Sequence, residues 1–168
     1  ADLGERVSAP TVARHYRSLQ QLFRWLANDG EIPESPMAKM SPPAVPEQPV
    51  PVLTDNEIAR LLAACHGTDF ESRRDEAIVR LFLDTGMRAS ELVGLKVGDI
   101  DKRESIAWVT GKGGRARACP YGVKTADALL RYLRARARLP RAAQYDELWL
   151  GAKGKGPLTD SGVRQLLE

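Results

Sequence analysis

The stretch LDTGMRASEL, residues 83–92, decides how the middle of this chain folds. Before it, apolar residues recur at the spacing of a helix, at Ala77, Ile78, Leu81 and Phe82. Gly86 is suited to the left-handed conformation that ends a helix, and a short new helix is expected over residues 89–95. Arg88 is therefore expected at the junction between two helices.

Two strand-like segments follow this junction, residues 105–110 and 115–119. The glycine-rich sequence GKGG, residues 111–114, separates them. Short strands on both sides of such a turn are typical of a β-hairpin. Lys112 is then expected at the tip of the hairpin.

The amino-terminal part is expected to form one amphipathic helix and a linker. Ser8 and Pro10 are a helix-start signal. Apolar residues then recur at helical spacing as far as residue 26, at Val12, Tyr16, Leu19, Leu22, Phe23 and Leu26. The other faces carry three cations and no acid, the cations being Arg14, Arg17 and Arg24. Seven prolines between residues 33 and 51 lack amide donors and fix φ, which predicts an extended linker.

The remaining segments predict further helices. Thr54 and Glu57 form a capping box that opens a helix to about Cys65. Residues 124–139 have helical spacing and Pro140 closes them, residues 147–150 are a candidate short strand, and Thr159 or Asp160 would cap a last helix. The expected fold class is mainly α with a small antiparallel β-hairpin or sheet, an α+β arrangement.

Composition sets limits on the class of protein. The 168 residues, 43% of them hydrophobic, suit one ordinary core or a compact domain with an appendage. No stretch approaches the roughly 18 apolar residues of a membrane span, and residues 1–6 lack the order of a signal peptide, so a cytoplasmic protein without membrane contact is expected. Cys65 and Cys119 have no metal-ligand spacing, so neither a disulfide nor a metal site is predicted.

The net charge of +3 is unevenly distributed. Residues 102–141 hold eleven Lys and Arg against only Glu104 and Asp127. Such a block is expected to face a polyanion. The alternative is a solvated helix surface, and the composition leaves both open.

The motifs resemble those of one family, the tyrosine recombinases or phage integrases. Residues 83–92, followed by Leu95 and by VGDID at 97–101, resemble the first catalytic box of its Xer-type members. GKGGR at 111–115 resembles the β-hairpin lysine motif of the family, and CPYG at 119–122 resembles the strand exit that follows. The two motifs occur in the family's order and spacing.

The resemblance also implies a division into parts. Residues 1–41 resemble the C-terminal part of the family's helical, DNA-binding core-binding domain, and residues 42–52 its proline-rich linker. Residues 53–168 would be the N-terminal, incomplete part of the catalytic domain.

The chemistry that the resemblance implies is attack by a tyrosine on a DNA phosphodiester, without metal or cofactor. The reaction gives a 3′-phosphotyrosyl link and a free 5′-hydroxyl. Arg88 is the candidate phosphate clamp, because a guanidinium donates two hydrogen bonds and stays charged. Lys112 is the candidate general acid that protonates the leaving oxygen. Glu91, one helical turn from Arg88, is the candidate that orients it.

Each role has a plainer alternative. Arg88 would otherwise be an ordinary surface arginine at a helix start, Lys112 a solubilising hairpin tip, and Glu91 a surface partner of Arg88. Six cations are candidate DNA contacts, without any indication of which reach bases and which reach phosphates. They are Arg14, Arg17, Arg24, Lys96, Arg115 and Arg117.

The family's second catalytic box and its nucleophilic tyrosine are not found. Neither His15 nor His66 stands in a His-x-x-Arg sequence. The four tyrosines precede the place where the family has its nucleophile, and they are Tyr16, Tyr121, Tyr132 and Tyr145. We therefore expect a truncated chain that binds DNA but does not cleave it.

The expected partner is double-stranded DNA. The resemblance implies a homotetramer on DNA for the full-length protein, with an accessory directionality factor as a further candidate partner. We expect a cytoplasmic, nucleoid-associated protein that a bacterium or a phage encodes. Two alternatives stay open. One is a catalytically incomplete module that occupies a recombination site or inhibits a full-length recombinase. The other is a helical protein-interaction domain that binds an acidic partner.

Overall fold

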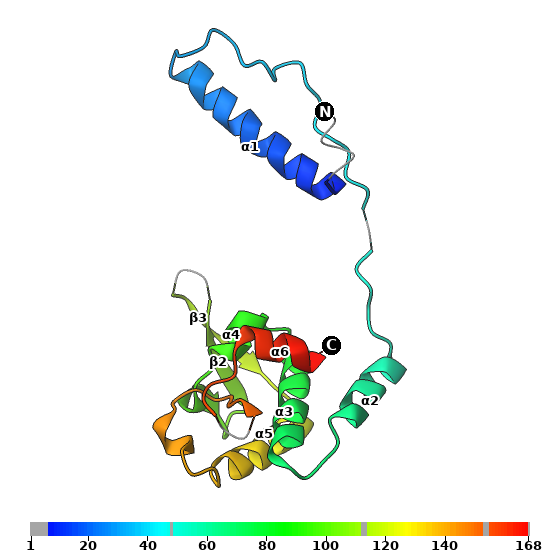
Figure 1. Ribbon diagram of the computed structural model, residues 1–168, viewed down its shortest axis with the longest axis vertical. Coiled ribbons are helices and arrows are strands. Elements are labelled where there is room, and N and C mark those ends of the chain that lie inside the picture. Colours follow the sequence, from blue (N-terminus) through cyan, green and yellow to red (C-terminus); the bar gives the residue numbers. More distant parts are fainter. Residues whose placement is uncertain (1–6, 48, 112–113, 153–154, 168) are drawn as a thin grey trace. The chain divides into compact units, whose positions relative to one another are not determined.

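The computed structural model describes residues 7–47, 49–111, 114–152 and 155–167. By contacts, the chain divides between Val52 and Leu53 into two compact units. Unit 1 contains the long helix α1, Ala9–Asn28, and the other helices and strands of the described residues lie in unit 2 (Figure 1). Within the described residues, no helix is both long and apolar enough to cross a membrane.

Helix α1 begins after Ser8 with Pro10 in its first turn, as predicted. The segment after it folds back onto it, and the Tyr16 hydroxyl donates a hydrogen bond of 2.6 Å to the Met40 carbonyl. The predicted apolar face is only partly covered, because Leu19 and Leu22 are each 47% exposed. Beyond Met40, the described residues as far as Thr54 form neither helix nor strand, which agrees with the prolines' lack of amide donors.

Unit 2 is mainly helical with one small sheet, as the sequence predicted. Its elements in chain order are α2 (Asp55–Ala64), α3 (Phe70–Thr85), α4 (Ala89–Val93), β1 (Ile100–Asp101), β2 (Ile106–Thr110), β3 (Ala116–Pro120), α5 (Val123–Arg136) and α6 (Asp160–Leu167). Short 3₁₀ turns lie at Val97–Asp99 and Ala142–Gln144. The sheet is antiparallel in the order β1-β2-β3, so the predicted hairpin is confirmed and gains a third short strand.

Most predicted helix ends are found where the capping signals are. Thr54 and Glu57 form the capping box of α2, and Gly86 ends α3 with φ 57°. The Thr159 hydroxyl, one of two predicted caps of α6, accepts the amide of Gly162 at 3.2 Å. Local signals were therefore sufficient at these three positions.

Three boundaries differ from the prediction. Helix α4 ends at Val93 rather than at 95. Helix α5 ends at Arg136 rather than at 139, because the amides of Arg138 and Leu139 bond three residues back and tighten the chain. Residues 147–150 do not form a strand, since they make only single bridges, Lys96 to Glu147 and Leu150 to Pro157.

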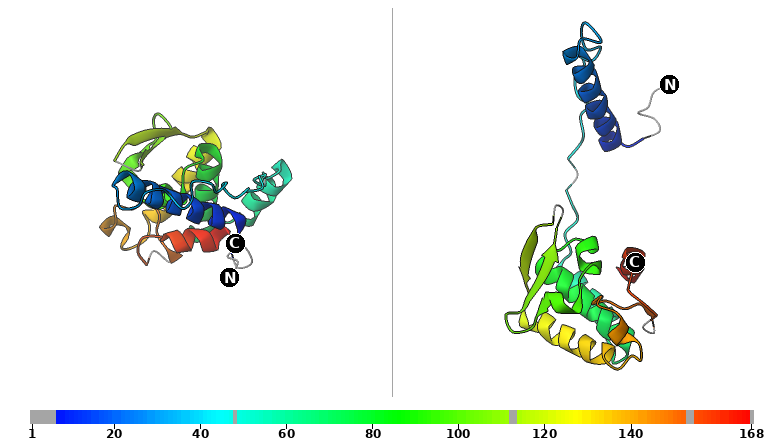
Figure 2. Two further views of the ribbon diagram at one scale, coloured as in Figure 1. Left: turned by 90° about the horizontal axis from the view of Figure 1, so that it is seen from above. Right: turned by 90° about the vertical axis from the view of Figure 1, so that its left-hand side faces the viewer.

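The core of unit 2 is formed by α3 and α5 together with α4, α6, the sheet and the segment after α5. Figure 2 shows these elements from a second side. Tyr132 on α5 is fully buried. Its hydroxyl donates to the Leu148 carbonyl at 2.8 Å and accepts the Leu150 amide at 3.0 Å. Burial raises the pKa of Tyr132 to about 12, so the hydroxyl stays protonated. The neighbouring Trp149 donates its indole N–H to the Leu92 carbonyl at 2.9 Å. This buried hydrogen bond attaches α4 to the core.

Tyr132→Phe is expected to lower the free energy of unfolding by about 2–4 kcal/mol, because it leaves a buried carbonyl and a buried amide without partners. Urea denaturation measures this change. Tyr121→Phe is the matched control, because the hydroxyl of Tyr121 makes only one hydrogen bond with the described part of the chain, a bond of 3.2 Å to the Asp101 carbonyl. Equal losses in the two variants would contradict the assigned role of Tyr132.

Candidate active site

Arg88 stands at the N-cap of α4, at the predicted junction between two helices. The left-handed Gly86 turns the chain, and the buried Met87 anchors it in the core. The backbone amide of Arg88 then donates to a Glu91 carboxylate oxygen at 2.8 Å. Glu91 thus caps the helix that carries it and holds the backbone of Arg88 in place.

The Glu91 carboxylate binds two guanidinium groups. Arg88 Nη1 lies 3.1 Å from Oε1, and Arg117 Nη2 on β3 lies 2.6 Å from Oε2. The side chain of Glu91 is only 6% exposed, whereas that of Arg88 is 76% exposed. The carboxylate therefore holds the Arg88 guanidinium from the protein side and leaves its outer face open.

The pKa of Glu91 is held below its ordinary value of 4.5. The largest cause is the hydrogen bond from the Arg88 amide, and the guanidinium groups of Arg117 and Arg88 add to it. Together they outweigh desolvation, which acts in the opposite direction. Glu91 is thus ionised at neutral pH, and the three side chains together carry one net positive charge.

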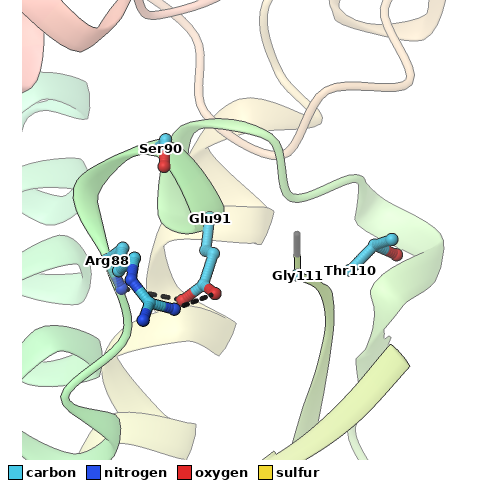
Figure 3. A pocket seen from close by; sticks show the side chains of 5 residues that line it. All are labelled: Arg88, Ser90, Glu91, Thr110 and Gly111. Atoms are coloured by element: carbon cyan, nitrogen blue, oxygen red, sulfur yellow. Dashed lines mark hydrogen bonds and ion pairs between the residues drawn. The ribbon is translucent and has the colours of Figure 1, made fainter. Parts of the chain in front are cut away.

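An open pocket of about 530 Å³ lies beside these groups, lined by Arg88, Ser90, Glu91, Thr110 and Gly111. Arg88 and Glu91 lie on its α4 side, and Thr110 and Gly111 on the side of the hairpin (Figure 3). An exposed guanidinium, a net positive charge and two hydroxyl-bearing residues are suited to an anion with several oxygens, such as a phosphate group.

The strands of the hairpin stay paired up to its turn, because the Gly111 amide donates to the Arg115 carbonyl at 2.9 Å. Lys112, the predicted general acid, lies outside the described residues. Its chain neighbour Gly111 nevertheless lines the Arg88 pocket. The hairpin motif and the first box thus meet at one site.

The six cations predicted to contact DNA are divided equally between the two units. Arg117 binds Glu91 beside the pocket, and Arg115 is exposed just before β3. Lys96 lines another pocket, together with Asp99 and Asp146. The other three are exposed along α1 in unit 1, namely Arg14, Arg17 and Arg24.

The basic block 102–141 is also divided, contrary to the expectation of a single polyanion-facing side. Arg117 contacts α4, whereas Arg131 and Arg134 lie on α5. Helices α4 and α5 lie at opposite ends of unit 2 in Figure 1 and in the right-hand view of Figure 2. Chain proximity did not imply proximity in space here, because β3 leads away from the site into α5.

Sequence reasoning missed two features of the site. Ser90 and Thr110 line the pocket, although Ser90 stands inside the quoted box and Thr110 directly precedes the lysine turn. The contact of Arg117 with Glu91 had no local signal.

Three of the four tyrosines donate hydrogen bonds to backbone carbonyls within the fold, and these are Tyr16, Tyr121 and Tyr132.

Curated relatives match nearly the whole chain. Tyrosine recombinase XerC of Corynebacterium efficiens is 33% identical over 98% of this chain and 52% of its own length. XerC of Roseiflexus sp. is 35% identical over 97% and 53%, and XerD of Listeria monocytogenes is 31% identical over 98% and 56%. The chain spans about half the length of the curated relatives it matches.

Solved structures show the same fold. The Tn1549 transposon integrase, in complex with a circular intermediate DNA, has a TM-score of 0.73 at 20% identity, covering 94% of this chain and 56% of that one. XerA recombinase has a TM-score of 0.60 at 23% identity, covering 98% and 53%. A model described as "Phage integrase family" matches residues 51–168, well over half of the chain. The chain therefore belongs to the phage integrase family, the tyrosine recombinases.

Proposed function

We propose that this chain binds duplex DNA and supplies the first half of the catalytic groups of a site-specific tyrosine recombinase. The observation that carries the proposal is the exposed Arg88 guanidinium, held by the nearly buried Glu91 carboxylate at a pocket that the lysine hairpin borders. The names of the curated relatives support the same activity.

In the proposed reaction, Arg88 binds the non-bridging oxygens of the scissile phosphate. Charge develops on these oxygens as the nucleophile attacks, and a preorganised cation stabilises it. Glu91 keeps the guanidinium in one orientation, so that little reorganisation is needed in the transition state. Lys112 gives its proton to the leaving 5′-oxygen. The second arginine and the nucleophilic tyrosine would come from the rest of a full-length recombinase.

The two units would divide the DNA contacts. We assign residues 1–41 to a core-binding domain, 42–52 to the linker and 53–168 to the catalytic domain. The cations of α1 are then phosphate contacts of the first domain, while Lys96 and Arg115 contact the same duplex from the second. The homotetramer, any directionality factor and action at the bacterial nucleoid belong to the full-length protein.

Salt dependence tests the DNA-binding part of the proposal. If about six cations contact phosphates, the affinity for a 30-base-pair duplex should fall about a thousandfold between 50 and 200 mM salt. Fluorescence anisotropy measures the slope. Arg24→Gln should reduce that slope by about 0.9, and Arg134→Gln on α5, which removes the same charge, should leave it unchanged.

The alternatives predict other results. Absent or salt-insensitive binding would contradict the proposal and favour a protein-interaction domain. Equal effects of Arg24→Gln and Arg134→Gln would show that binding follows total charge and not the assigned surface. DNA binding by the chain would agree with two alternatives: part of an active recombinase, and a module that only occupies a recombination site. An assay of DNA cleavage by the full-length protein distinguishes them.

A further inference from the structure

Glu91 connects two elements that are distant in sequence. It accepts the amide and the guanidinium of Arg88 on α4, and the guanidinium of Arg117 on β3, 26 residues away. The side chain of Arg88 also lines the pocket, and 76% of it is exposed. The orientation of Arg88 therefore depends on a carboxylate that β3 also holds.

Arg117 is firmly placed for this contact. It pairs with the buried Val109 in the middle of the hairpin. Its Nη1 lies 3.1 Å from the Cys119 sulfur and its Nη2 lies 2.6 Å from Glu91 Oε2. Both terminal nitrogens are thus engaged within the protein. The Arg117 side chain is nevertheless 44% exposed, so the phosphate contact that the sequence suggested for it stays a prediction.

We propose that Arg117 is a positioning residue: it fixes the Glu91 carboxylate from the side of β3, so that Glu91 can hold Arg88 toward the scissile phosphate. This inference rests on the function proposed above and adds a residue to its machinery. In this arrangement the hairpin has two roles: it carries Lys112, the proposed general acid, and through Arg117 it helps to hold Arg88, the proposed phosphate clamp.

The physical reason is the division of the carboxylate oxygens. Oε2 accepts both the Arg88 amide and Arg117, while Oε1 accepts Arg88 Nη1. Without Arg117, the nearly buried carboxylate has one cationic partner among the described residues, and that partner is mostly exposed. The carboxylate then loses an anchor that is independent of Arg88, and Arg88 gains rotational freedom. A mobile guanidinium loses more conformational entropy than a fixed one when it binds the transition state, and the reaction is slower.

The first test uses this chain itself. NMR titration of the Glu91 side-chain carboxyl carbon should give a higher pKa in Arg117→Gln than in the unchanged chain, since an opposite charge and a hydrogen bond are lost. The Nε–Hε signal of Arg88 should exchange faster with water. Arg117→Lys keeps the positive charge but lacks the planar guanidinium fork. It should restore most of the low pKa of Glu91, but less of the slow exchange of the Arg88 Nε–Hε proton. Arg115→Gln removes the same charge from the same hairpin and should change neither signal.

Two results would overturn the inference. One is a Glu91 pKa and an Arg88 exchange rate that are the same in Arg117→Gln as in the unchanged chain. The other is an equal response to Arg115→Gln, which would indicate a general charge effect. Thermal unfolding shows whether each variant is folded before it is compared, and Arg117→Lys replaces Arg117→Gln in the comparison if the latter unfolds.

The second test separates this inference from the proposed function. In the full-length recombinase, Arg117→Gln should lower the rate of cleavage about tenfold to a hundredfold with the affinity for duplex DNA nearly unchanged, and Arg117→Lys should recover part of the rate. A loss of affinity with an unchanged cleavage rate would make Arg117 a DNA contact and refute the inference alone. Absence of cleavage by the unaltered protein would refute the proposed function, whereas the NMR result would still decide whether Arg117 positions Glu91 and Arg88.

Discussion

Arg88→Ala in the full-length recombinase is expected to slow DNA cleavage by a factor of about a thousand or more, while the affinity for duplex DNA falls less than about tenfold. Loss of one preorganised donor to a developing oxyanion already costs a factor of about 10²–10³ in comparable sites. Arg88 offers a charged fork instead of a single neutral donor, so the loss should be at least as large. In the proposed function, the binding energy is spread over many phosphate contacts, and Arg88 would supply only one of them.

Single-turnover cleavage of a labelled duplex, with binding measured on the same samples, checks this result. Arg88→Lys keeps the charge but not the planar fork, and it should remain strongly impaired. Arg134→Ala on α5 removes one exposed arginine from the opposite end of unit 2 and is the control. Cleavage by Arg88→Ala at a rate close to that of the unaltered protein would refute the assignment of the phosphate clamp.

The junction that carries Arg88 could be predicted because its determinants are local. A glycine at a left-handed position and an apolar helix before it are sufficient to place the end of α3. Glu91 lies three residues from Arg88, so their contact also follows from helix geometry. The hairpin follows from two strand-like segments around a glycine turn. These features need no knowledge of the rest of the fold.

The missed features depend on contacts between distant residues. Arg117 and Glu91 meet only because the hairpin packs against α4 through β2, which brings the long side chain of Arg117 on β3 within reach of Glu91. Residues 147–150 have the composition of a strand, but hydrogen bonds from Tyr132 hold their backbone in the core instead. The apolar face of α1 was correctly placed on a helix, yet its burial depends on what packs against it, and Leu19 and Leu22 remain half exposed. Periodicity describes one element and says little about its neighbours.

The assignment of Lys112 is a prediction from the family motif, and it has the second largest expected effect. Lys112→Ala should slow cleavage of an ordinary duplex by a factor of about 10²–10⁴, the usual contribution of a general acid. The leaving 5′-alkoxide is a strong base and needs a proton as the P–O bond breaks. The effect should therefore depend on the leaving group.

A duplex with sulfur in place of the 5′-bridging oxygen tests that dependence. A thiolate is a much weaker base than an alkoxide and leaves without protonation, so Lys112→Ala should cleave the sulfur duplex nearly as fast as the unaltered protein does. Arg88→Ala should stay slow on both duplexes, because charge still develops on the non-bridging oxygens. If Lys112→Ala were equally impaired on both duplexes, Lys112 would be a phosphate or DNA contact and not the general acid. Because the two residues differ in this one response, a single pair of substrates distinguishes the clamp from the proton donor.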